Sequence, residues 1–171
     1  MITPTSDDLA VAIRAFLLSL FPTGVEVVRG LDNSVPMPAG PFIQFTPTAQ
    51  AALSTNHSVL DTLTQMRTVK TPTRYNVQFD CYGPLSSDYA TQIVQMWRDQ
   101  YGCDMLADVG APLYCTDPTQ VPLINGEENY EQRWALTALL QFNPSVTVTQ
   151  QSADSLAIEL VSVDAEYPPS P

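Results

Sequence analysis

The stretch YEQRWALTALLQFNPSVTV, residues 130–148, decides the fold. Apolar and polar residues alternate in it from position 130 to position 142, which is typical of a β-strand with one buried face. Asn143-Pro144 interrupts the alternation, and residues 146–148 resume it. A further stretch, LAIELVSVD at residues 156–164, predicts a second strand. None of these residues forms a recognisable catalytic group, so the region indicates a structural sheet.

The N-terminal segment predicts a helix. Apolar residues recur there at three- and four-residue spacing: Leu9, Ile13, Phe16, Leu17 and Leu20. Thr5 or Ser6 can cap this helix, acidic residues at positions 7 and 8 suit its first turn, and Phe21-Pro22 should end it. Short strands are expected at residues 25–28, at 42 to about 53 and at 75–81.

A second helix is expected after the strand at residues 75–81. Its apolar stripe consists of Ala90, Ile93, Val94, Trp97 and Tyr101. Ser86 or Ser87 would cap its start, and Gly102 would follow its end. A proline-broken segment then holds one short strand at residues 113–115.

Two segments do not fit a packed core. Residues 50–73 are rich in Thr and Ser, which predicts either a protruding hairpin arm or a loop that is disordered in the monomer. Residues 165–171 contain three prolines and predict an extended tail, either bound to a neighbour or disordered. The order of elements predicts a single α+β domain over residues 1–171: one mostly antiparallel sheet, two helices packed on it, an arm at about 50–73 and the tail.

The charge is unevenly distributed. Residues 1–74 carry five basic and five acidic side chains, whereas residues 75–171 carry two and thirteen, so the second part accounts for the whole net charge of −11. Such a surface repels phosphate and argues against DNA binding by counterion release, although it could line a channel through which DNA slides. Three cysteines, no signal-peptide pattern and no membrane-spanning run predict a soluble protein of the cytoplasm.

The usual catalytic and metal-binding patterns are absent. No GxG motif is present for nucleotide binding. His57 is the single histidine, and with Cys81, Cys103 and Cys115 it lacks the spacing of a metal site, so no metal and no cofactor are expected. A trio of carboxylates, Glu127, Glu128 and Glu131, could act as acid and base, but a solvated turn after Asn125-Gly126 is the stronger interpretation.

Arg67, Lys70 and Arg74 are the one concentration of basic residues in this acidic protein. They could be solvated residues that keep an edge strand from aggregating. They could equally reach an acidic face of an identical neighbour, because rings form through contacts between unlike surfaces. With Tyr167 and Pro168 of the tail, these three residues are the candidate subunit interface.

From residue 42 to Pro169 the chain resembles the neck or tail terminator (tail-completion) proteins of tailed bacteriophages. The resemblance lies in LSTN at 53–56 with RTVKTPTRY at 67–75, in FDCYGP at 79–84 followed by MWRD at 96–99, and in RW at 133–134 through NP, QQ, VD and YPP at 167–169. It implies a structural virion protein, not an enzyme, that forms a ring, usually a hexamer, at the head-proximal end of the tail tube. There it ends tube polymerisation and joins the tail to the head connector, and DNA passes through its lumen.

The resemblance also implies partners and a location. The partners would be identical subunits, the tail tube protein and the head–tail connector or stopper, with the sheath protein as a further candidate and no membrane. The location would be the neck or tail of the virion, after assembly in the host cytoplasm. Alternatives are another head–tail connector or stopper ring, a monomeric module that binds a host protein, and a hydrolase that uses the carboxylates at 127–131.

Overall fold

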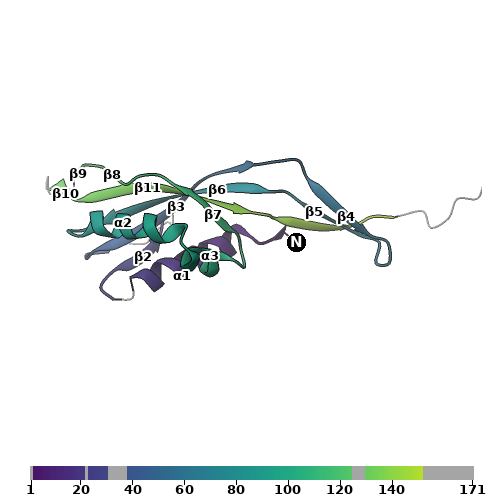
Figure 1. Ribbon diagram of the computed structural model, residues 1–171, viewed down its shortest axis with the longest axis horizontal. Helices are drawn as coiled ribbons and strands as arrows, with labels where there is room; N and C mark the ends of the chain where they lie inside the picture. The colour runs from purple at the N-terminus through teal and green to yellow at the C-terminus, as the bar shows by residue number, and fades with distance from the viewer. Residues whose placement is uncertain (1, 22, 31–37, 125–129, 152–171) are drawn as a thin grey trace, which may run out of the picture.

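The computed structural model describes residues 2–21, 23–30, 38–124 and 130–151. It has an elongated shape, with a wide body at one end and a narrow arm projecting from the other (Figure 1). The body is a six-stranded sheet with helices on one face, and the arm is a separate four-stranded sheet. The predicted α+β class, with a mostly antiparallel sheet and a protruding hairpin, is confirmed.

Two long strands form the centre of the body sheet. They are β6 (Thr73–Tyr82) and β11 (Arg133–Phe142), paired antiparallel over their whole length. The sheet order is β2 (Glu26–Arg29), β3 (Phe42–Ala52), β6, β11 and β7 (Ala111–Cys115), and β8 (Thr119–Gln120) also pairs with β11. Among the strands of the described residues, only the pair β2–β3 is parallel. The alternation of apolar and polar residues predicted both β6 and β11 correctly, because each of these strands buries one face.

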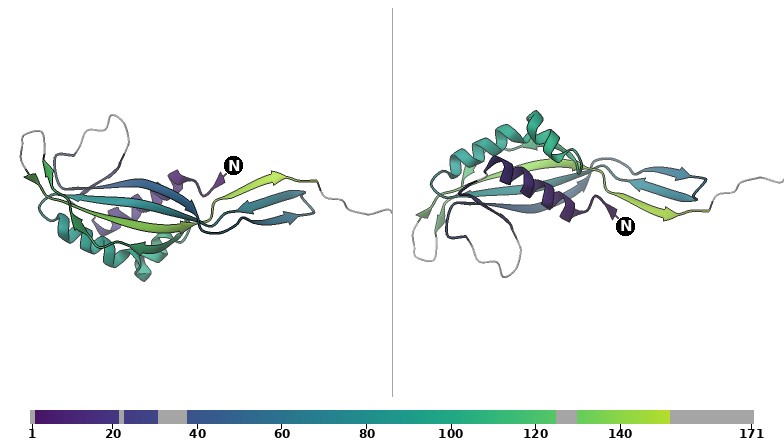
Figure 2. Two further views of the ribbon diagram at one scale, coloured as in Figure 1. Left: turned by 90° about the horizontal axis from the view of Figure 1, so that it is seen from above. Right: turned by 90° about the horizontal axis from the view of Figure 1, so that it is seen from below.

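Three helices pack on the same face of this sheet: α1 (Ser6–Leu20), α2 (Ser86–Trp97) and α3 (Gln100–Leu106) (Figures 1 and 2). The core lies between them and the strands, where Phe16 and Phe79 each contact the ring of Trp97 edge-on at 5.7 Å between centroids. Trp97 is fully buried, and its indole N–H donates to the carbonyl oxygen of Leu139 at 3.2 Å. The Trp97 side chain of α2 thus contacts α1, β6 and β11.

The cap of α1 is the predicted Thr5. Its hydroxyl accepts from the backbone N–H of Asp8 at 3.1 Å, and the Asp8 carboxylate accepts from the Thr5 N–H at 2.7 Å. The bonds that the Thr5 N–H and the Thr5 hydroxyl donate to the carboxylate lower the pKa of Asp8, so the capping box is charged at neutral pH. All the predicted apolar positions of α1 are buried except Leu20, which is half-buried.

The predicted second helix is two helices. α2 ends at Trp97, and Asp99 caps α3 by accepting from the backbone N–H of Tyr101 at 3.0 Å. Tyr101 is therefore 38% exposed and not part of the apolar stripe. Gly102 lies inside α3, buried, where a Cβ would overlap the carbonyl oxygen of Met96. The predicted helix end at Gly102 is wrong because α2 already ends at Trp97 and α3 begins at Gln100.

The predicted serine cap of α2 is also wrong. The residue at the N-cap position is Leu85, and no side chain caps the helix there. Ser86 is instead fully buried, and its hydroxyl has no hydrogen-bond partner in the part of the chain that the structure describes.

The arm contains the predicted hairpin and two strands from elsewhere. The hairpin is β4 (His57–Asp61) and β5 (Met66–Lys70), β12 (Ser145–Thr149) pairs with β5, and β1 (Ile2–Thr3) pairs with β12. The order β1-β12-β5-β4 brings both ends of the described chain into one small sheet (Figure 2). None of the buried core residues belongs to the arm, as the Ser- and Thr-rich composition predicted.

Prolines mark the junction between body and arm. β5 passes into β6 through Thr71-Pro72, and β11 passes into β12 through Asn143-Pro144. A proline has no N–H, so it cannot donate to a strand ladder. The two proline carbonyls still accept, from the backbone N–H of Leu53 at 2.8 Å and of Thr71 at 3.2 Å. The junction is therefore hydrogen-bonded across all three crossing segments.

Several predicted segments lie outside the described residues. These are the strand at residues 156–164, the tail at 165–171 and the turn at 125–129, although β9 (Leu123–Ile124) and β10 (Tyr130–Glu131) pair on either side of that turn. The assignment of residues 1–171 to one domain stays a prediction. In the described residues, none of the helices has the length and apolar character needed to cross a membrane.

Candidate subunit interface

Arg67 lies in the middle of the arm. It stands on β5, opposite Leu60 of β4 and Val148 of β12. Its guanidinium donates to the Ser58 hydroxyl at 3.1 Å and to the Gln150 side-chain oxygen at 3.3 Å. Arg67 thus bridges the two strands on either side of β5, and its contacts are to neutral groups.

Lys70 lies at the base of the arm and is exposed. It lines a groove together with Asp8 at the start of α1 and Asp108 after α3. Because side chains alternate along a strand, Lys70 and Arg67 stand on opposite faces of the arm sheet. The two cations therefore present their charge in different directions.

Arg74 lies beyond the junction, in the body. It is half-buried on the sheet face opposite the helices, since its neighbours Thr73 and Tyr75 are buried on the helix face. Its Nε is buried without a hydrogen-bond partner among the described residues, as is the Oδ1 of Asn76 two positions along. The structure therefore places the three predicted cations on adjoining strands but not in one patch. The other two candidates, Tyr167 and Pro168, lie outside the described residues.

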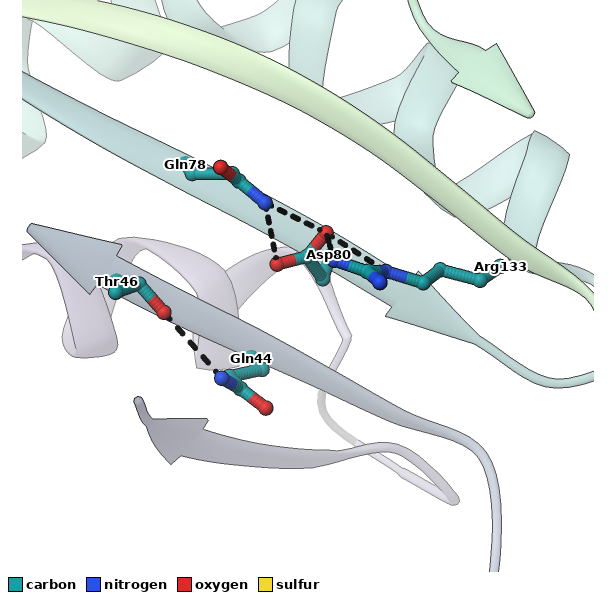
Figure 3. Close-up of polar contacts among 5 residues, drawn as sticks. All are labelled: Gln44, Thr46, Gln78, Asp80 and Arg133. Carbon is teal, nitrogen blue, oxygen red and sulfur yellow. Dashed lines mark hydrogen bonds and ion pairs between the residues drawn. The ribbon is translucent and has the colours of Figure 1, made fainter. Parts of the chain in front are cut away.

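The helix-free face of the body sheet contains a buried ion pair that the sequence did not predict. The Asp80 carboxylate accepts from Arg133 Nε at 3.1 Å and from a terminal Arg133 nitrogen at 2.8 Å (Figure 3). Gln78 donates to both carboxylate oxygens, at 3.1 and 2.9 Å. Arg133 also lies 5.7 Å from the ring centre of Tyr82. In the described residues no helix covers this face, so its side chains supply their own polar partners.

Several large apolar side chains of the arm are exposed to solvent. Exposed fractions are 57% for Val59, 94% for Leu63 and 47% for Val148. Burial of such side chains is the main driving force of protein association. These side chains are apolar area on the arm that a contact with another subunit would bury.

Four exposed carboxylates from the acidic half of the sequence lie on and around α2 and α3. They are Asp88, Asp99, Asp104 and Asp108, here called the acidic surface. Two other described carboxylates of this half lie elsewhere: Asp80 is buried in the ion pair on the helix-free face, and Asp117 lines a groove with Gln78 and Arg133. The helix side of the body thus presents a group of negative charges away from the arm tip.

Comparison with known proteins identifies the family. The sequence model of a family described as phage neck terminator protein matches residues 7–165. The chain belongs to this family. The resemblance seen in the sequence is thereby confirmed, and family membership places this terminator-family chain in the tail or neck of a phage particle.

A solved structure shows the same fold. It is the sheath/tube terminator of PVC, an extracellular contractile injection system, in its extended state. The TM-score is 0.51 at 13% sequence identity, with 95% of this chain and 66% of that chain covered, so the chain spans just under two thirds of that protein's length. A search of the curated proteins found no match.

The groups of this terminator-family protein that could do chemistry are dispersed. Burial raises the pKa of Cys81 and that of Cys115 to about 12, so both thiols stay protonated and unreactive at neutral pH. His57 is exposed on β4. In the described residues no three metal-binding side chains come together. Of the carboxylate trio, Glu131 belongs to β10, and Glu127 and Glu128 lie outside the described residues.

Proposed function

We propose that this protein is a structural component of the phage virion that forms a ring, a hexamer, at the head-proximal end of the tail tube. There it ends tube polymerisation and joins the tail to the head connector. The observation that carries the proposal is the match to the neck terminator family over residues 7–165. The proposal treats residues 1–171 as one working unit and assigns it no catalytic, cofactor or metal role.

The two ends of the molecule support assembly into a ring. A closed ring of identical subunits needs two different surfaces on each copy, one matching the other. This chain has an arm with exposed apolar side chains at one end and a body with an acidic surface on its helix side. In the proposed ring the arm of each copy, with Arg67 and Lys70, contacts the next copy, and Arg74 contributes from the body beside the junction. Tyr167 and Pro168 extend the same contact.

The charge distribution supports passage of DNA without binding. A lumen lined by the acidic surface would repel phosphate, so DNA would move through it without adhering. The net charge of −11 makes sequence-independent binding of DNA by this protein energetically unfavourable.

The proposed partners follow from the position of the ring. One rim contacts the last ring of the tail tube protein, and the other contacts the head–tail connector or stopper. In a particle with a sheath, the sheath protein is a further partner. Assembly takes place in the host cytoplasm, and no contact with a membrane is proposed.

The first experiment is electron microscopy of particles made when this gene is interrupted in its parent phage or prophage. We expect filled heads separated from tails, and tails of abnormal length. Complementation with the intact gene should restore joined particles. Intact virions in its absence would refute a terminator role and favour a host-directed binding module. Joined tails on unfilled or leaking heads would indicate a connector or stopper instead.

The contribution of the arm is tested by Arg67→Ala with Lys70→Ala. The matched control is Arg14→Ala with Arg98→Ala, which removes the same charge from two exposed positions of the body, one on α1 and one just after α2. Both variants should keep the wild-type circular dichroism spectrum. Native mass spectrometry should show rings for the control and a shift to monomer for the arm variant. Equal ring formation by the two variants would indicate that the arm cations only keep the arm soluble and make no subunit contact.

A further inference from the structure

The arm sheet lacks a core of its own. It has four strands, one of them only two residues long, and none of its residues belongs to the buried core. Sheets of this size are stable when one face packs against another layer. In the described residues neither a helix nor a second sheet covers the arm (Figures 1 and 2).

The two faces of the arm differ in character. The register places these side chains together on one face, here called the apolar arm face: Ser58, Leu60, Arg67, Val69, Val146 and Val148. The opposite face carries His57, Val59, Asp61, Met66 and Lys70 among several threonines. A strand added at the edge would therefore match the arm if it were apolar on one side and polar on the other.

The outer edge of the arm, strand β4, is open. In the described part of the chain, no strand pairs with β4 on the side away from β5. Soluble proteins usually block such an edge with Lys, Pro or a bulge, because unpaired backbone groups recruit other strands. β4 reads HSVLD, has neither Lys nor Pro, and pairs with β5 without a register shift. Its backbone is therefore ready to accept another strand.

The sequence after the arm tip has the required pattern. At the tip, the N–H of Gln150 donates to the carbonyl of Gln65 at 2.9 Å, so residues 152–171 start there. Alternate positions 156, 158 and 160 are Leu, Ile and Leu, and position 159 between them is Glu. Residues 152–171 carry four carboxylates and no basic group, whereas residues 53–74 carry three basic groups and one acidic. Opposite charge favours their encounter and fixes register.

We propose that residues 156–164 of one copy add as a strand to the open edge of β4 in a second copy. Leu156, Ile158 and Leu160 then extend the apolar arm face, and Glu159 lies on the side of His57. Backbone hydrogen bonds supply affinity, and the alternating side chains supply specificity, as in other strand-addition complexes. The inference rests on the proposed ring and names the segment that links one subunit to the next.

Chain length favours a second copy over the same chain. From β12, the position outside the chain's own β4 is three strand spacings away, about 14 Å. The five steps from Gln151 to Leu156 span about 17 Å when fully extended. A segment that must also reverse direction around the tip has almost no slack for this path. Beside β12 itself, β1 already pairs with Ser145 and Val146, which leaves a shorter free edge.

Disulfide trapping in assembled full-length protein tests the inference. The background carries Cys103→Ser, since the other two cysteines are buried. Leu60→Cys is combined in turn with Leu156→Cys, Ile158→Cys or Leu160→Cys, which lie on the same face. The matched controls combine Leu60→Cys with Ala157→Cys or Glu159→Cys, which point to the other face. After mild oxidation, non-reducing electrophoresis separates species, and mass spectrometry identifies the joined peptides.

The expected result is a ladder of covalent oligomers up to ring size for at least one same-face pair, several times stronger than for either control. A cross-link confined to monomers would overturn the inference in favour of pairing within one chain. Rings that form without any cross-link would overturn it and leave the proposed ring standing. Unmodified protein that forms no rings under assembly conditions would overturn both.

Discussion

Removing the Arg133 side-chain charge should destabilise the protein far more than breaking an exposed ion pair. In the variant Arg133→Met the Asp80 carboxylate, only 4% exposed, loses two charged donors. Loss of one partner of a fully buried ion pair costs about 3–5 kcal/mol. Here Gln78 keeps its two hydrogen bonds, and the Arg133 side chain is 23% exposed, so some water can reach the site.

Because of these two features, we expect Arg133→Met to lower the free energy of unfolding by about 2–3 kcal/mol. For a chain of this size, such a loss lowers the melting temperature by about 5–10 °C. The measurement is urea unfolding at concentrations where the protein is monomeric, followed through the fluorescence of the two tryptophans, Trp97 and Trp134.

Two further variants make the test specific. Asp7→Asn breaks the ion pair with Arg29, in which the Asp7 side chain is 80% exposed, and should cost less than about 1 kcal/mol. Asp80→Leu combined with Arg133→Met removes both charges and should recover part of the stability lost in the single variant. If Arg133→Met costs no more than Asp7→Asn, or if the double variant is no better than the single one, the ion pair is not what stabilises this face.

Three other predictions follow from buried or charged groups. Gly102→Ala should lower the melting temperature strongly, because a Cβ there meets backbone that cannot move aside, whereas Cys103→Ala in the same helix should be mild; equal effects would contradict the close contact. The folded pKa of Cys81 and of Cys115, about 12, exceeds the ordinary thiol value of 9, so their stabilising contribution is complete below pH 9 and is lost as the pH rises toward 12; a thiol reagent at pH 8 should label Cys103 alone until urea is added. Reversing charges on the acidic surface to Lys should slow DNA ejection from assembled particles, and unchanged ejection would exclude that surface from the lumen.

The parts of the fold that sequence predicts well are those where burial imposes a period. β6 and β11 alternate and α1 repeats every three or four residues, because each buries one face against the other elements. The helix break at Asp99 was missed because Tyr101 follows Trp97 at helical spacing, so the apolar period continues across it. The signal that could have found it is Asp99 itself, a capping residue in the middle of the pattern.

The arm was predicted only in part, because strand pairing between distant segments leaves no local pattern. The side chains of Thr3 and Ser145, which hydrogen-bond across β1 and β12, are 142 positions apart. Two residues such as Ile2 and Thr3 carry too little periodicity to be assigned to any strand. The hairpin of β4 and β5, in contrast, is local, and its polar composition indicated correctly that it lies outside the core.

The candidate interface shows a similar limit. Arg67, Lys70 and Arg74 are a cluster in sequence, but the break at Pro72 separates the alternation of the arm from that of the body. Counting positions across that proline therefore could not tell which faces the cations share. The ion pair of Asp80 and Arg133 was hidden for a related reason: its two residues lie on neighbouring strands whose pairing register no single sequence states.

The same prolines explain how a small body can direct a long arm. β5 and β12 are continuations of β6 and β11, so the arm inherits its direction from the two central strands of the core. At the crossing, Pro72 and Pro144 end the body ladder, yet their carbonyls and the bond from the Thr71 hydroxyl to Asn56, 2.8 Å, connect all three segments. A ring closes only if every copy presents its contact at the same angle. We therefore expect substitutions at the junction to change which assemblies form, and their size, before they change whether the body folds.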